Sequence, residues 1–150
     1  MLISEALAER AEANNRLSQL KGRLATVARV QEGDAPDENP QALLDEAERL
    51  LARIEELVRR INLTNAQVMV GEMTMTEALA QRDHLLAKRR LLTEFADRAA
   101  ARQDRYTVSE VKYVATVDIR ALRSRADEAS KRYRELDLLI QQVNWSTQLL

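Results

Sequence analysis

Apolar residues recur every three or four positions through long segments of the chain, which is the spacing of an amphipathic helix. In residues 3–29 these positions are Ile3, Ala6, Ala13, Leu17, Leu20, Leu24 and Val27. In residues 40–68 they are Leu43, Ala47, Leu50, Ile54, Leu57, Ile61, Thr64 and Val68, and in residues 119–143 they are Ile119, Leu122, Ala126, Ala129, Tyr133, Leu136, Ile140 and Val143. Each stripe must lie against a neighbour, so the pattern predicts helices that pack lengthwise.

A further helix is predicted over residues 77–102, with a less regular pattern. Its apolar residues are Leu79, Leu85, Leu86, Leu91, Leu92, Phe95, Ala96 and Ala99, which spread over a wide arc. A wide apolar arc indicates contact with more than one neighbour, as at the centre of a bundle or at a subunit interface.

Capping residues and turn formers mark the predicted helix boundaries. Ser4, Asn39, Thr76 and Asp118 are the expected caps, and Pro40 suits the first turn of the second helix. The acidic stretch VQEGDAPDENP predicts a solvated loop after the first helix. Around Met73–Met75 we expect a turn that covers the end of the bundle, with a short extended piece as the alternative.

The segment QDRYTVSEVKYVATVD, residues 103–118, stops the helical pattern and is rich in β-branched and aromatic residues. It predicts a β-prone insert between the third and fourth helices. The expected fold is therefore mostly α: an antiparallel bundle of four long helices in one domain, residues 1–150, with a short β-prone insert.

The composition agrees with long helices, because charged residues make up 31% of the chain and aromatic residues only 3%. The formal net charge of −1 offers no overall field that would attract nucleic acid. The chain has no cysteine, which excludes disulfides and thiolate chemistry and fits a cytoplasmic protein. It also lacks a run of about 20 apolar residues that could span a bilayer.

Recognisable metal and cofactor motifs are missing. His84 is the single histidine and belongs to neither a Glu-x-x-His nor a His-x-x-x-His pattern. The acidic loop lacks the ligand order of an EF-hand. We therefore expect no metal, no cofactor and no catalytic residue. The basic cluster Lys88–Arg90 has no aromatic interleaving, so nucleic-acid binding is not favoured.

Polar residues near the expected helix ends form a candidate binding cluster. They are Asn62, Asn65, Asp83, Arg102, Asp104, Arg105 and Tyr106. An inter-helix hydrogen-bond network, capping and ion pairing are the alternative roles. Tyr113, Phe95 and Trp145 are interface candidates, although an aromatic residue near a chain end more often anchors the core.

Five segments in order along the chain resemble the septicolysin-like family of small bacterial helical proteins. They are VQEGDAPDENP, INLTNA, MTEALAQRD, RQDRYTVSEVKYVATVDI and NWSTQLL. The resemblance implies a compact helical protein that self-associates, and the family name implies membrane activity. It carries no catalytic or ligand residues over to this chain.

These features favour a non-enzymatic helical protein that acts through self-association, expected as a homo-oligomer, or through another protein partner. The first alternative is a membrane-active, pore-forming protein, as the resemblance implies. The second is an enzyme with a polar site where helix ends meet the insert, in which an aspartate beside arginine and tyrosine acts as a base.

If the polar cluster is a binding site, replacing Arg105 or Tyr106 by Ala should disturb assembly or binding more than replacing an outer charge, Arg53, by Ala. Solution mass and thermal melting of the three variants measure the difference. Equal effects at all three positions would contradict the prediction.

Overall fold

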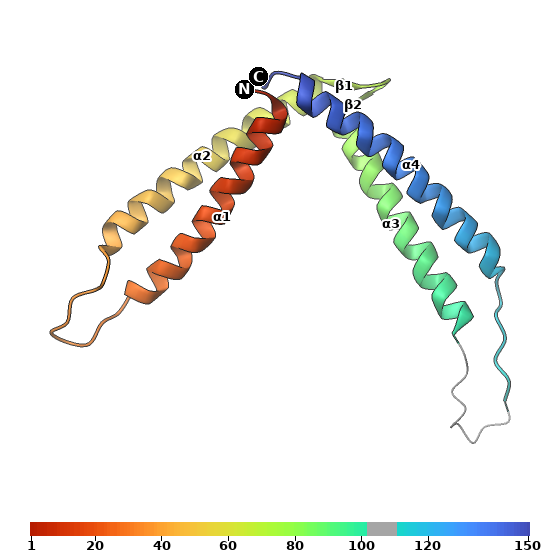
Figure 1. The fold of residues 1–150 in the computed structure, drawn as a ribbon, viewed down its shortest axis with the longest axis horizontal. Coiled ribbons are helices and arrows are strands. Elements are labelled where there is room, and N and C mark those ends of the chain that lie inside the picture. The colour runs from red at the N-terminus through yellow and green to blue at the C-terminus, as the bar shows by residue number, and fades with distance from the viewer. Residues whose placement is uncertain (102–110) are drawn as a thin grey trace. The chain divides into compact units, whose positions relative to one another are not determined.

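The computed structural model describes residues 1–101 and 111–150, which form four long helices and one small antiparallel sheet. The elements are α1 (Ile3–Val27), α2 (Pro40–Gln67), β1 (Met69–Val70), β2 (Met73–Thr74), α3 (Met75–Ala100) and α4 (Ile119–Ser146), shown in Figure 1. The predicted mostly α class with four long helices is confirmed.

The described residues group into two units. Unit 1 contains Met1–Met69 and Gln142–Leu150, and unit 2 contains Val70–Gln141, so α4 contributes to both. The single domain over residues 1–150 stays a prediction, and each unit is described by itself.

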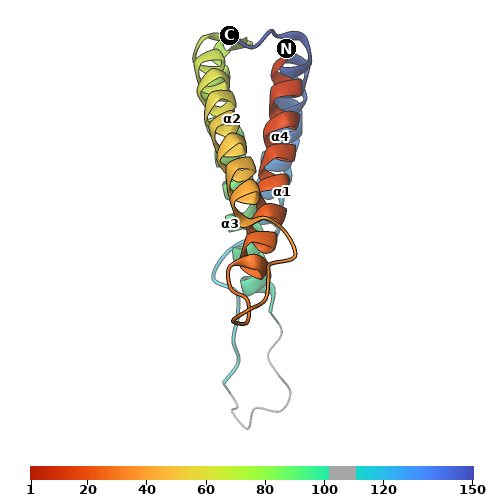
Figure 2. The same cartoon turned by 90° about the vertical axis from the view of Figure 1, so that its left-hand side faces the viewer.

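Unit 1 is an antiparallel pair of α1 and α2, which lie side by side (Figures 1 and 2). Residue numbers rise along α1 as their contacts fall along α2: Glu9 pairs with Arg53, and Arg16 with Glu46. The predicted stripes form the line of contact, here called the seam. Its buried cluster is Leu17, Leu20, Val27, Leu43 and Ala47, with Leu24, Leu50 and Ile54 packed against it.

The C-terminal segment closes the open end of this pair and crosses from the start of α1 to the end of α2 (Figure 2). Leu149 is buried in a cluster with Ala6, Leu57 and Ile61. Backbone hydrogen bonds link Ile3 N to Thr147 O (3.0 Å) and Leu149 N to Met1 O (2.9 Å). The two ends of the chain are thereby held together in one antiparallel bridge, Leu2 with Gln148.

Near the end of α2, the buried polar side chain of Thr64 has hydrogen-bond partners. Its side chain is fully buried, and its hydroxyl donates to Arg60 O (2.8 Å) and accepts from Leu150 N (3.0 Å). A buried hydroxyl with no partner would destabilise the fold. The Thr64 hydroxyl therefore both donates and accepts a hydrogen bond within unit 1.

Unit 2 pairs α3 with α4, again antiparallel, since Asp97 bonds Arg123 and Arg82 bonds Asp137. The contact between α3 and α4 also has a buried cluster, toward the end of α3 and the start of α4. It contains Leu92, Ala96, Leu122 and Ala126, with Val117 and Ile119 packed against them. The predicted α4 stripe is buried or half-buried throughout, as its spacing requires.

The helix caps follow side-chain chemistry. Asn39 Oδ1 accepts from Gln41 N (3.0 Å) and Ala42 N (3.3 Å), and Asp118 Oδ1 accepts from Ala121 N (3.0 Å), so both predicted caps are confirmed. Thr74, not Thr76, caps α3, because Thr74 and Glu77 have the three-residue spacing of a capping box.

The first helix also starts earlier than the predicted cap. Ser4 lies inside the first turn of α1, where its hydroxyl is buried and has no hydrogen-bond partner among the described residues. The cap position belongs to Leu2, whose backbone N donates to the Glu5 carboxylate at 2.7 Å. Glu5, at the third helical position, therefore satisfies the backbone N–H of the cap residue.

The described β structure lies outside the predicted insert, at a place where the sequence predicts a short extended piece, around Met73–Met75, only as the alternative. The strands that the structure describes connect α2 to α3, with Gly71 in their turn at a φ of +64°, a conformation that glycine adopts without strain. The described part of the predicted insert, residues 111–118, contains no strand. β-propensity reports side-chain packing on a sheet more than a backbone preference, and residues 111–116 are exposed.

Replacing Leu149 by Ala should lower the free energy of unfolding by about 2–5 kcal/mol, because it leaves a cavity between α1 and α2. Urea unfolding followed by circular dichroism measures the change. Leu150→Ala is the matched control, since the neighbouring Leu150 side chain is exposed. Equal effects of the two substitutions would show that Leu149 does not anchor the helix pair.

Candidate functional site

The predicted polar cluster is only partly within the described residues. Asn62 and Asn65 lie near the end of α2 in unit 1, and Asp83 lies on α3 in unit 2. Arg102, Asp104, Arg105 and Tyr106 fall outside the described residues. The cluster as a joint site stays a prediction.

Its three described members have different surroundings. Asn62 is exposed, and Asp83 is exposed beside Arg82, at 3.4 Å. Asn65 is half-buried, and its Oδ1 is buried with no hydrogen-bond partner among the described residues. Of the three, Asn65 therefore retains an unused acceptor.

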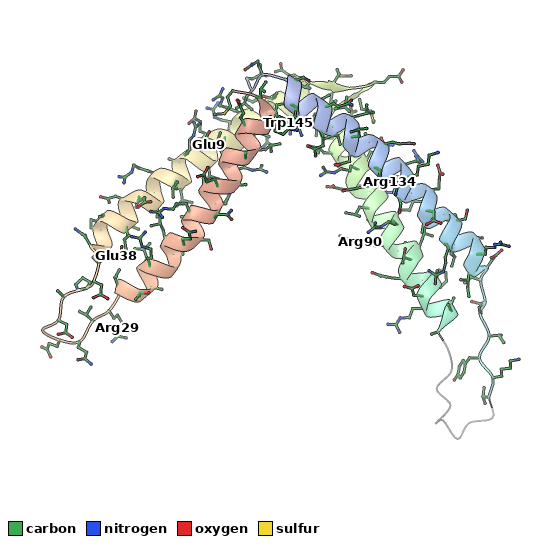
Figure 3. The ribbon with its side chains drawn as sticks, in the orientation of Figure 1. Glu9, Arg29, Glu38, Arg90, Arg134 and Trp145 are labelled. Atoms are coloured by element: carbon green, nitrogen blue, oxygen red, sulfur yellow. The ribbon has the colours of Figure 1, made fainter. Side chains whose placement is uncertain are left out.

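One face of unit 1 carries a run of ion pairs that involve α1, α2 and the loop between them. Arg53 binds Glu9 through two nitrogens, at 2.6 and 3.0 Å, and Glu56 at 2.7 Å. Arg16 binds Glu46 at 2.8 Å, and Arg23 binds Glu38. Glu9 and Glu38 mark the two ends of this paired face (Figure 3).

Arg53 is thus not the outer charge that the sequence suggested. Its guanidinium joins two helices through a bidentate contact, and hydrogen bonds to Glu9 and Glu56 raise its pKa. Arg53→Ala would break this contact, so Arg134, an exposed arginine on α4 with no ion pair in the described chain, is the better control.

The same pairs lower carboxyl pKa values. Hydrogen bonds from Arg53, Arg23 and Arg16 respectively lower the pKa of Glu9, Glu38 and Glu46. In unit 2, hydrogen bonds from the backbone N–H and hydroxyl of Thr74 lower the pKa of Glu77. These shifts arise from ion pairing and helix capping.

A shallow groove lies where α3 ends, with a volume of about 290 Å³. We call it the aromatic groove. Its lining residues are Phe95, Arg98, Ala99, Ala101, Tyr113, Val114, Ala115 and Thr116. Two of the three predicted interface residues therefore meet here. Phe95 is 47% exposed and Tyr113 is 78% exposed, so both can meet a partner.

Trp145 occupies a different place. It lies on α4 near the C-terminus (Figure 3) and is 66% exposed. The expectation that an aromatic residue near the chain end anchors the core is therefore wrong for Trp145. Leu149 has that role in unit 1, and no helical periodicity in the sequence could have identified it, because it follows the end of α4.

A second groove, the polar groove, lies between α3 and α4 with a volume of about 360 Å³. Its lining residues are Arg89, Arg90, Thr93, Glu94, Ala126, Asp127 and Ser130, and Arg90 is labelled in Figure 3. The groove places part of the predicted basic cluster beside two carboxylates. Mixed charges of this kind suit a polar protein surface better than a nucleic-acid backbone.

Within residues 1–101 and 111–150, no three His, Cys, Asp or Glu side chains gather closely enough to hold a metal ion. None of the described helices is both long and apolar enough to cross a membrane.

The fold and its surfaces define a protein of antiparallel helix pairs with exposed aromatic side chains. The chain belongs to a family of unknown function, DUF6847, whose profile matches residues 10–149. It is also similar to a functionally unknown conserved protein from Corynebacterium diphtheriae, known from a crystal structure. The two are 53% identical with a TM-score of 0.94, over 100% of this chain and 99% of the other.

A comparison with curated proteins finds no match. Neither the family nor the similar structure carries the septicolysin-like name that the sequence resemblance suggested. Both support a small protein of uncharacterised function with a helical fold.

The ion pairs of unit 1 predict a pH dependence of stability. The folded-state pKa values of Glu9, Glu38 and Glu46 lie below the ordinary value of 4.5. Their stabilisation is present above the unfolded-state pKa and is lost as the pH falls through the lowered values. We therefore expect the urea midpoint to fall between about pH 5 and about pH 3.

Arg53→Met should make this fall smaller, because it removes the partner of Glu9. Arg134→Met is the control and should leave the pH dependence as in the wild type. Identical pH dependence in Arg53→Met and wild type would show that the Glu9 pair contributes nothing to it.

Proposed function

We propose that the protein is a non-enzymatic helical protein that acts by self-association or by binding another protein chain. The observation that supports this most is the position of its aromatic residues. Phe95, Tyr113 and Trp145 are exposed and Tyr133 is half-buried, so none of the four described aromatic residues lies in the core. Aromatic side chains otherwise dominate cores, and on surfaces they are enriched in binding hot spots.

The aromatic groove is the contact site that we propose. The Phe95 ring lies on a regular helix and so is held by a rigid element, while Tyr113 and Val114 come from the segment before α4. Arg98 at the same groove adds a guanidinium that can bind a carboxylate of the partner. An apolar centre beside a charged rim is the usual anatomy of a protein interface.

Two other roles remain as alternatives. The septicolysin-like resemblance supports membrane activity, and the predicted polar cluster around Arg105 and Tyr106 would support an enzyme. Exposed aromatic and leucine side chains could also meet lipid, so the experiment below includes a lipid measurement. The cytoplasmic location and the homo-oligomeric state expected from the sequence are part of the main proposal.

Light scattering of the purified full chain over a concentration series tests the proposal. We expect an oligomer whose dissociation constant rises at least about tenfold in the double variant Phe95→Ala/Tyr113→Ala, since two hot-spot side chains are removed. Val30→Ala, an exposed apolar residue in the loop after α1, is the matched control and should change nothing.

Dye release from liposomes is measured on the same samples. Release that Phe95→Ala/Tyr113→Ala abolishes would favour the membrane role over protein contacts. A monomer at every concentration, whose capture of protein partners from its own cell extract is unchanged by the double substitution, would overturn the proposal.

A further inference from the structure

A helix that contacts one neighbour buries one stripe, and α3 carries a second stripe beside its seam. The members are His84, Lys88, Leu91, Phe95 and Arg98, each three or four positions after the last, so they share one face. Leu91 is 67% exposed, and His84 and Arg98 are exposed as well. No acidic residue belongs to this set, which we call the basic stripe.

Helix α2 carries a second stripe with the same spacing and the opposite charge. Its members are Leu44, Glu48, Leu51, Glu55 and Val58. Leu51 is 52% exposed, Leu44, Glu48 and Glu55 are exposed, and Val58 is half-buried. No basic residue belongs to this set, which we call the acidic stripe.

The charges of the two stripes differ from those along the seam of unit 1. On the paired face, Glu46 and Glu56 of α2 have arginine partners. Glu48 and Glu55 in the acidic stripe have no ion pair in the described chain, and neither do Lys88 and Arg98. These four charges, without an ion pair in the described chain, flank exposed leucines on α2 and α3.

We propose that the acidic stripe on α2 of one copy packs against the basic stripe on α3 of a second copy. This inference rests on the proposed function and names its partner. Two stripes with matching three-and-four spacing can interlock their leucines, while carboxylates meet ammonium and guanidinium groups at the edges. Each stripe covers 15 positions, a length of about 21 Å at 1.5 Å per residue.

A second copy suits these stripes because one chain presents both halves of the complementary pair. A two-fold dimer offers the α2–α3 contact twice, because each copy supplies one acidic stripe and one basic stripe. The basic stripe also shares Phe95 and Arg98 with the aromatic groove, so the contact continues into the site proposed above.

Charge reversal tests this pairing. Glu48→Lys/Glu55→Lys places four cations across the contact, and Lys88→Glu/Arg98→Glu places four carboxylates there. Each double variant should raise the dissociation constant about tenfold or more, because like charges replace attractive pairs. The quadruple variant combines the two double variants, so it restores opposite charges across the contact and keeps the net charge of the wild type. Its solution mass should return to the wild-type value, and its association should weaken in high salt as that of the wild type does.

Controls separate pairing from folding and from a general charge effect. Glu12→Lys and Arg134→Glu reverse exposed charges outside both stripes and should leave the mass unchanged. Circular dichroism should show wild-type helix content in every variant, since all the substituted side chains except Lys88 are exposed and Lys88 is half-buried.

Each outcome decides the question. A lower solution mass in both double variants, together with the wild-type solution mass in the quadruple variant, supports the pairing. An oligomer that is insensitive to the reversals, or that the quadruple variant fails to restore, overturns the pairing and leaves self-association standing. A wild-type chain that is monomeric throughout overturns the pairing and self-association together.

Discussion

A helix that packs against one neighbour can bury only one stripe of side chains. This constraint decides which apolar side chains of the described helices are buried and which are exposed. In unit 1 the stripes of α1 and α2 meet along their whole length and form the cluster around Leu20 and Leu43. In unit 2 the stripes of α3 and α4 meet around Leu92 and Leu122. Any apolar residue about 100° around the helix from the seam stays on the surface. Leu51 and Leu91 are exposed for this reason.

Charge is distributed according to the same geometry. Residues beside the seam can reach the neighbouring helix, so Arg53 spans to Glu9 and Arg16 to Glu46. Such half-exposed pairs each contribute little to stability, because water and salt screen them. Charges further round the helix, such as Glu48 and Lys88, have no ion pair in the described chain. The described charged side chains therefore fall into two groups, those with an ion-pair partner and those without one.

The C-terminal segment completes unit 1 by a different route. A two-helix pair has an open end where the last turn of one helix and the first turn of the other expose polar backbone and apolar side chains. Leu149 fills that end, and the backbone of Leu150 satisfies the buried Thr64 hydroxyl. Because this closure uses hydrogen bonds between distant parts of the chain, it couples the stability of α1 and α2 to the last residues of the sequence.

The sequence alone determined the helices. Periodicity located all four of them and the buried faces of α1, α2 and α4, and cap chemistry located Asn39 and Asp118, since both depend on local spacing. Thr74 was missed although its capping-box spacing to Glu77 was visible in the sequence. The tertiary structure decided what depends on distant contacts: that Leu149 and not Trp145 anchors an end, and that Arg53 is a bridging residue. It also decided that the strands lie before α3, because strand formation needs a partner strand that propensity cannot supply. The candidate site divides in the same way. The sequence selected Phe95 and Tyr113 by residue type, and only the fold placed them in one groove, because the residues between them do not follow a regular helix.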